Sequence, residues 1–224
     1  MKLDDIGIYN KVLEYICLEL SHSLGNIGNE YKKDVEEIRL RAGMPLNVYL
    51  KGENYFVSPD GELNKTEAKA LLVKPEYIHK TFQLISNYSI YAFQEEIKNG
   101  FITLRGGHRV GIGGKVLYGN MGIETIRNIS SLNIRIAREK IGISNKIIQY
   151  ILDFNNSIYN TLIVSPPQCG KTTLLRDIIR TLSNGTNLPN GKAFKIGVID
   201  ERSEISGMNN GYVARRLAEM GFDI

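Results

Sequence analysis

The segment Thr161–Arg180, T-L-I-V-S-P-P-Q-C-G-K-T-T-L-L-R-D-I-I-R, decides the fold class of the second half of this chain. It opens with Thr161–Val164, a short apolar run typical of a buried strand, and a proline-rich loop follows. From Gly170 onward the apolar residues have helical spacing: Leu174, Leu175, Ile178 and Ile179. This order matches the phosphate-loop motif G-x-x-x-x-G-K-[ST], except that serine replaces the first glycine. The segment therefore predicts a strand, a phosphate-binding loop and a helix.

The ligand expected in this loop is a purine nucleoside triphosphate, ATP, together with Mg²⁺. Backbone N–H groups and the helix dipole favour negative charge at a helix N-terminus. Lys171 is expected to reach the β- and γ-phosphates, and the Thr172 hydroxyl to ligate Mg²⁺. Ser165 stands at the turn that glycine usually opens, and the two prolines after it restrict the same path. A chance Gly-Lys-Thr at a helix start is the alternative. The residues predicted to bind ATP are Ser165, Pro166, Pro167, Gln168, Cys169, Gly170, Lys171, Thr172 and Thr173.

A second apolar run, Ala193–Ile199, ends at two carboxylates, Asp200 and Glu201. A strand, a helix and a further strand predict a right-handed parallel crossover. Ligand sites in such sheets lie at the carboxyl ends of the strands, so both carboxylates are expected beside the phosphate loop. Asp200 is predicted to hold the Mg²⁺ shell and Glu201 to orient or deprotonate the attacking water. A solvated acidic loop is the alternative.

The chain is expected to form two domains. Residues 1–140 predict an α+β domain with an antiparallel sheet, because short alternating strands and turns dominate there. Residues 141–224 predict an α/β P-loop (RecA-like) nucleotide-binding domain. The expected elements are a helix over residues 5–22, strands over 37–41, 46–50 and 54–57 with a turn at 51–53, helices over 75–86 and 89–98, a glycine-rich strand–turn–strand from 101, strands over 122–127 and 132–138, and a helix over 144–154.

The composition is that of a soluble globular protein, with 42% hydrophobic and 23% charged residues in 224. The net charge of +4 is too small to argue for nucleic acid, so no nucleic-acid partner is expected. The two cysteines, Cys17 and Cys169, lie far apart and suggest no disulfide or metal framework. The start of the chain lacks the features of a signal peptide, and no apolar run is long enough to span a bilayer. We expect a cytoplasmic protein whose membrane contact is peripheral.

Five blocks carry a resemblance to a known family. They read E-E-I-R-L-R-A-G-M-P-L, F-I-T-L-R-G-G-H-R-V-G-I-G-G, I-S-S-L-N-I-R-I-A-R-E, S-P-P-Q-C-G-K-T-T-L-L-R-D and V-I-D-E-R-S-E-I. Together, over residues 34–206, the chain resembles the secretion-type ring ATPases of endospore-forming bacteria. The resemblance implies a hexameric ATPase in the mother-cell cytoplasm, at the base of a channel complex of membrane proteins that links mother cell and forespore.

The resemblance also implies roles for single residues. Lys171 and Thr172 match the phosphate-loop positions, and Glu201 matches the general base. In such rings the N-terminal domain can supply arginines to the γ-phosphate of a neighbour. From the basic cluster Arg105, His108, Arg109, Arg127, Arg135 and Arg138, we predict that Arg135 and Arg138 act as arginine fingers. Solvated arginines or ion pairs within the domain are the alternative, and His108 is expected to be a turn or packing residue.

Two other functions stay open. The family's later apolar strand that ends in Asp-Glu is missing here, so the P-loop domain is expected to be truncated. An ATP-gated assembly protein with little hydrolysis is therefore the first alternative to a motor. A nucleic-acid-associated P-loop ATPase is the second, although no basic stretch with interleaved aromatic residues is present.

Overall fold

The computed structural model describes residues 4–119, 122–138, 140–155, 157–166, 169–185, 187–188, 191–200 and 205. The chain divides into two compact units, each described here by itself. Unit 1 comprises residues 4–104 and 108–138, and the residues after Arg138 belong to unit 2.

Unit 1 is built on a seven-stranded sheet with the strand order β4-β3-β2-β1-β7-β6-β5. Every neighbouring pair is antiparallel, which agrees with the sheet predicted for this part of the chain. The strands are β1 Val35–Arg41, β2 Asn47–Leu50, β3 Glu53–Val57, β4 Leu63–Asn64, β5 Phe101–Leu104, β6 His108–Gly119 and β7 Gly122–Arg135.

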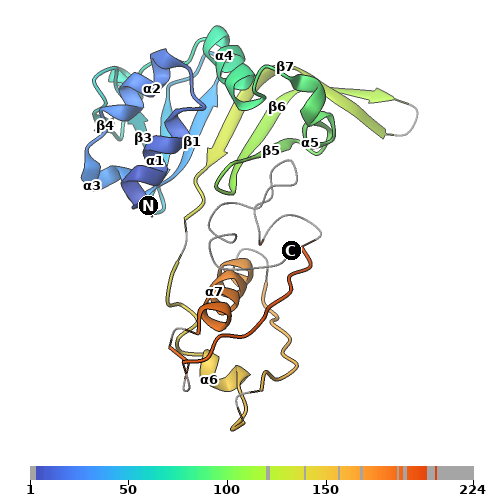
Figure 1. The fold of residues 1–224 in the computed structure, drawn as a ribbon. Helices are drawn as coiled ribbons and strands as arrows, with labels where there is room; N and C mark the ends of the chain where they lie inside the picture. The colour runs from blue at the N-terminus through green and yellow to red at the C-terminus, as the bar shows by residue number, and fades with distance from the viewer. Residues whose placement is uncertain are drawn as a thin grey trace. The chain divides into compact units, whose positions relative to one another are not determined.

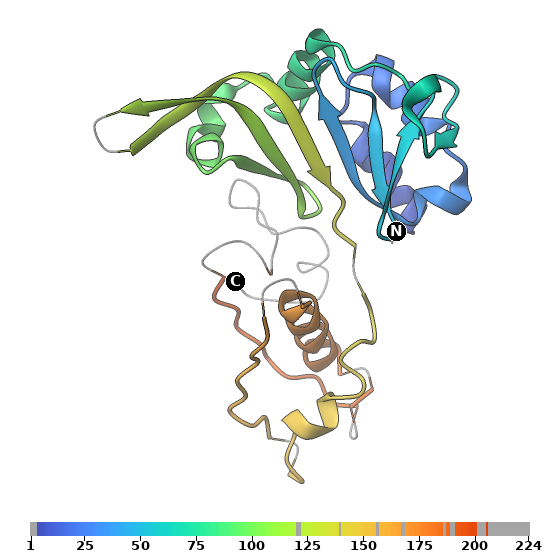
Figure 2. The same ribbon diagram turned by 180° about the vertical axis from the view of Figure 1, so that it is seen from behind.

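Helices cover one face of this sheet. Figures 1 and 2, which view the unit from opposite sides, show α1 and α2 on the same face of strands β1 to β3. The helices of unit 1 are α1 Asp5–Leu13, α2 Leu18–Gly25, α3 Asn29–Lys32, α4 Pro75–Ile85 and α5 Gln94–Lys98, with 3₁₀ turns η1 Glu67–Lys69 and η2 Ile90–Phe93. Alternate strand residues face the helices, so Ile38 and Leu40 are fully buried while Arg39 between them is half-buried. The core of unit 1 lies between these helices and the sheet.

The single helix predicted over residues 5–22 is wrong, because α1 ends at Leu13 and α2 begins at Leu18. Cys17 has extended backbone angles, and its N–H donates to the Thr81 hydroxyl at 3.1 Å. A tertiary hydrogen bond therefore replaces the helical one at Cys17, and the apolar spacing alone could not reveal this.

The prediction of two strands over residues 122–138 is also wrong, because β7 is continuous from Gly122 to Arg135. Asn128 takes a positive φ of 47°, and a register shift lies between Gly113 and Lys115 of β6. This irregularity lets β7 continue through the polar stretch between the two predicted strands without a break. The β6–β7 pair therefore extends past the other strands as a two-stranded ribbon (Figure 1).

In unit 2 the helix predicted after the phosphate loop is confirmed as α7, Lys171–Asn184. It buries Ile178 and Leu182 in a small apolar cluster that includes residues of α6, Ile148–Ile151. That short helix replaces the longer one predicted over 144–154, and Leu152 after it bridges to Ile158.

The predicted strands over 161–164 and 193–199 are not formed, although the structure describes both segments. A strand forms only when its N–H and C=O groups find a partner ladder, and neither segment has one among the described residues. Leu162, Val164 and Ile199 are accordingly 86%, 79% and 98% exposed. The RecA-like fold of this unit stays a prediction.

Candidate nucleotide-binding site

Gly170, at the start of α7, has a backbone conformation that favours glycine. Gly170 lies immediately before the helix with φ 81° and ψ 15°, in the left-handed region that favours glycine. Among the described residues, no heavy atom lies within 4 Å of where a Cβ would stand. The backbone angle, not lack of space, is therefore what favours glycine at this position.

Lys171, the first residue of α7, folds its side chain back over the loop. Its Nζ donates to the carbonyl oxygens of Ser165 at 2.8 Å and Pro166 at 3.0 Å, and lies 3.3 Å from Ser165 Oγ. The ammonium group is thus held by neutral oxygens, which bind it less strongly than phosphate oxygens would. A polyphosphate can therefore replace these neutral oxygens as the partner of the Lys171 ammonium group.

The first turn of α7 keeps its positive electrostatic character. Its residues are Lys171, Thr172, Thr173 and Leu174, none of which is acidic. The N–H groups of a first helical turn have no partners within the helix, and the macrodipole adds positive potential there. Thr172 and Thr173 are half-buried in this turn. The residues of this turn therefore supply no carboxylate that would compete with a bound anion.

The other predicted loop residues are only partly placed. Cys169 is exposed, while Pro167 and Gln168 lie outside the described residues. Ser165 Oγ bonds to the Pro166 carbonyl oxygen at 3.1 Å, so the serine at the first glycine position stabilises the loop entry by a local contact.

The acidic segment lies beside α7. Asp200 Oδ2 accepts the Ile205 N–H at 2.9 Å, and Arg176 of α7 donates from Nε to the Ile205 carbonyl oxygen at 3.0 Å. Arg176 therefore connects α7 to Ile205, a contact that sequence reasoning missed. Glu201, the predicted general base, lies outside the described residues.

Arg138, predicted to act as an arginine finger, is bound to groups of unit 1. Its guanidinium donates to the carbonyl oxygens of Val35 and, at 2.8 Å, of Lys32, and its Nε lies 3.7 Å from Asp5 Oδ1. Burial also lowers the pKa of this group, while nearby acids oppose the shift. These partners all belong to unit 1, so Arg138 has a structural role there.

Arg135 remains a candidate, because its side chain is 62% exposed. Its Nη2 and Nε bond to Glu37 Oε1 at 3.0 and 3.2 Å. Burial alone would raise the pKa of Glu37, but hydrogen bonds from Arg39 and Arg135 outweigh it and lower the pKa. Glu37 thus holds one edge of a guanidinium group whose side chain is still largely exposed.

His108 is a packing residue, as predicted. It is 4% exposed, and its Nδ1 accepts the Ala137 N–H at 3.0 Å.

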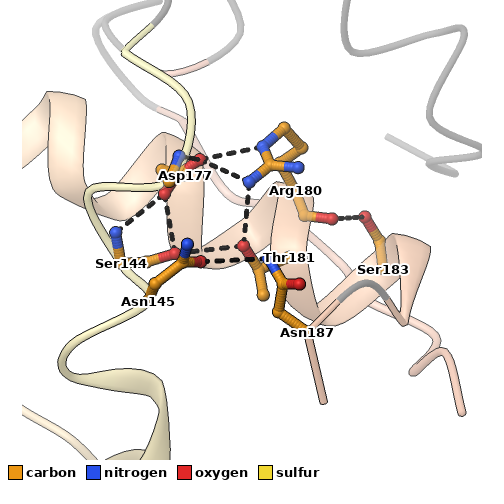
Figure 3. A network of polar contacts seen from close by, with 8 residues as sticks. Ser144, Asn145, Asp177, Arg180, Thr181, Ser183 and Asn187 are labelled. Atoms are coloured by element: carbon orange, nitrogen blue, oxygen red, sulfur yellow. Dashed lines mark hydrogen bonds and ion pairs between the residues drawn. The ribbon is translucent and has the colours of Figure 1, made fainter. Parts of the chain in front are cut away.

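A buried polar network on α7 was not foreseen from the sequence (Figure 3). Asp177 is 4% exposed. Its Oδ2 accepts the Ser144 N–H at 2.8 Å and the Ser144 hydroxyl at 2.7 Å, and its Oδ1 accepts Gly142 N–H at 3.1 Å and Arg180 Nε at 2.8 Å. The Thr181 hydroxyl joins the network 3.0 Å from Ser144 Oγ. Burial would raise the pKa of Asp177, but these hydrogen bonds lower it below its usual range.

Comparison with known proteins identifies the family. A family model described as sporulation stage III, protein AA matches residues 9–222. Stage III sporulation protein AA of Bacillus subtilis (strain 168) is 39% identical over 202 residues, which cover 90% of this chain and 61% of that protein. The uncharacterized protein ycf45 of Cyanidium caldarium is 39% identical over 80 residues, which cover 36% of this chain and 21% of that protein. No solved structure matches. The chain spans 61% of the Bacillus relative's length, and it belongs to the stage III sporulation protein AA family.

Proposed function

We propose that this chain binds ATP and Mg²⁺ at the start of α7 and acts in sporulation as an ATPase. The observation that carries the proposal is the placement of Lys171: it begins the helix next to a left-handed Gly170, and its partners among the described residues are neutral oxygens of Ser165 and Pro166. In this proposal the Thr172 hydroxyl ligates Mg²⁺ with help from Asp200, and Glu201 activates water.

The proposed assembly is a ring, a hexamer, in the mother-cell cytoplasm. The family name supports a sporulation role, and the resemblance to secretion-type ring ATPases suggests that the ring powers or assembles a mother cell–forespore channel. Its contact with the membrane proteins of that channel would be peripheral. None of the described helices has both the length and the apolar character needed to cross a membrane. Arg135 would act on the γ-phosphate of a neighbouring subunit, as an arginine finger does.

An ATP-gated assembly protein with little hydrolysis is the second candidate. The observation that favours it is the lack of strand pairing at 161–164 and 193–199 in the described part of unit 2. Without that sheet, the carboxylates are not fixed at a common edge with the loop. Binding without turnover would be the expected behaviour.

Lys171→Ala tests the proposed site. Because the loop loses its only cation, the affinity for the fluorescent analogue mant-ATP with Mg²⁺ is expected to fall at least about tenfold. Lys192→Ala is the matched control, since Lys192 is an exposed lysine of the same unit. Equal affinity for both variants and the unchanged chain would overturn the proposal. Phosphate release by the unchanged chain, measured alongside, separates hydrolysis from gating.

A further inference from the structure

Helix α7 makes polar contacts at two places along its length. The first residue, Lys171, donates hydrogen bonds to the loop before the helix. Six residues later, Asp177 accepts three hydrogen bonds of 2.7 to 3.1 Å from Gly142 and Ser144 (Figure 3). Both contacts lie on one hydrogen-bonded helix. A displacement of the start of α7 is therefore carried to the Asp177 carboxylate.

The segment that Asp177 holds follows one of the points where the chain passes from unit 1 to unit 2. Unit 1 ends at Arg138, which the carbonyl oxygens of Lys32 and Val35 fix in place. Only residues 139–141 separate Arg138 from Gly142. The segment held by Asp177 is therefore close in sequence to Arg138.

We propose that Asp177 is a positioning residue that transmits nucleotide binding at Lys171 to the segment that contains Gly142 and Ser144. The inference rests on the proposed function. When a phosphate group binds the Lys171 ammonium group, the hydrogen bonds from Lys171 to Ser165 and Pro166 break, and the start of α7 moves. Asp177 then shifts Gly142 and Ser144.

A purely structural role for Asp177 would give a different result. A structural contact stabilises segment 140–147 equally with and without nucleotide. Removing it would speed amide exchange in both states by the same factor. A coupling contact changes the difference between the two states, and that difference is the quantity to measure.

The test is hydrogen exchange, followed by mass spectrometry, on peptides covering 140–147 of the whole chain. Saturating AMP-PNP with Mg²⁺ is expected to slow exchange there at least about threefold in the unchanged chain. Asp177→Asn should bind the analogue with similar affinity but lose that slowing. Ser183→Ala is the matched control: Ser183 lies on α7 and bonds to the Arg180 carbonyl oxygen at 3.2 Å, away from this segment. It should keep the slowing.

The outcomes separate the two proposals. No analogue binding by the unchanged chain refutes the proposed function. Binding without slowing in the unchanged chain, or equal slowing in Asp177→Asn, overturns the role of Asp177 and leaves the nucleotide site standing. If Asp177→Asn fails to fold, Ser144→Ala decides: it removes the hydroxyl donor and keeps the N–H donors, so a reduced slowing supports the coupling and an unchanged slowing overturns it.

Discussion

At the scale of single residues, Asp177 shows how a buried charge is kept in an apolar helix face. Burial disfavours the carboxylate, yet the N–H groups of Gly142 and Ser144, the Ser144 hydroxyl and the Arg180 guanidinium satisfy it. A carboxylate with this many donors is more stable in the folded than in the unfolded chain, so its pKa is lowered on folding.

The lowered pKa predicts an acid-dependent contribution to the stability of unit 2. A group with a depressed folded pKa stabilises the fold above its unfolded pKa of about 3.9 and loses that contribution as the pH falls through the folded value. Asp177→Asn should therefore cost about 2 kcal/mol of unfolding free energy at pH 7. The difference from the unchanged chain should shrink below about pH 4. Denaturant unfolding at several pH values measures this, and a pH-independent difference would contradict it.

Gly170 gives a second prediction at this scale. Its φ of 81° makes Gly170→Ala strained, although a methyl group has room among the described residues. The substitution should cost about 1 to 2 kcal/mol of stability and weaken mant-ATP binding. Gly100→Ala is the control, because Gly100 has a φ of 78° in unit 1. It should show a similar stability loss without any loss of nucleotide affinity.

At the scale of elements, tertiary contacts end the helices where the sequence pattern would continue them. The apolar spacing runs from α1 through α2, but Cys17 turns its N–H away from the helix and toward α4. Thr81 is fully buried there, so this hydrogen bond replaces one that water would otherwise supply.

Thr81→Val should therefore destabilise unit 1 by about 1 to 3 kcal/mol, because a buried N–H loses its only side-chain acceptor while the shape is kept. Thr81→Ser keeps the hydroxyl and should cost less. Chemical denaturation of both variants measures the difference. A loss in Thr81→Ser with none in Thr81→Val would mean that packing of the methyl group, not the hydrogen bond, matters at this position.

An element or contact was predictable from the sequence when the residues that determine it lie close together in the chain. The β2–β3 hairpin was predictable, because its turn residues Lys51 and Gly52 adopt positive φ values of 49° and 83°. The start of α7 was predictable for the same reason, and Lys171 lies where the motif puts it. The contacts of Arg138 were not predictable because its partners Lys32 and Val35 are distant in sequence, and the polar network of Asp177 was missed because Ser144 is likewise distant.

At the scale of the whole molecule, the proposed hydrolysis would draw on groups from both units. The two described apolar segments around the phosphate loop are unpaired, and Arg135 belongs to unit 1 while Lys171 belongs to unit 2. If Arg135 acts on a neighbouring subunit, each complete site combines the Lys171 of one copy with the Arg135 of another. Such a division has a consequence that can be measured by mixing variants.

Arg135→Ala and Lys171→Ala chains should each release little phosphate alone. In an equal mixture, a site is complete when an Arg135→Ala copy supplies the lysine and a Lys171→Ala neighbour supplies the arginine. With random assembly this occurs at about a quarter of the sites, so roughly a quarter of the normal rate should return. Arg39→Ala, which also removes a donor to Glu37, is the control and should keep its own activity. Mixtures that co-assemble by size measurement yet regain nothing would rule out an arginine supplied in trans, whereas full activity of Arg135→Ala alone would show that Arg135 has no catalytic part.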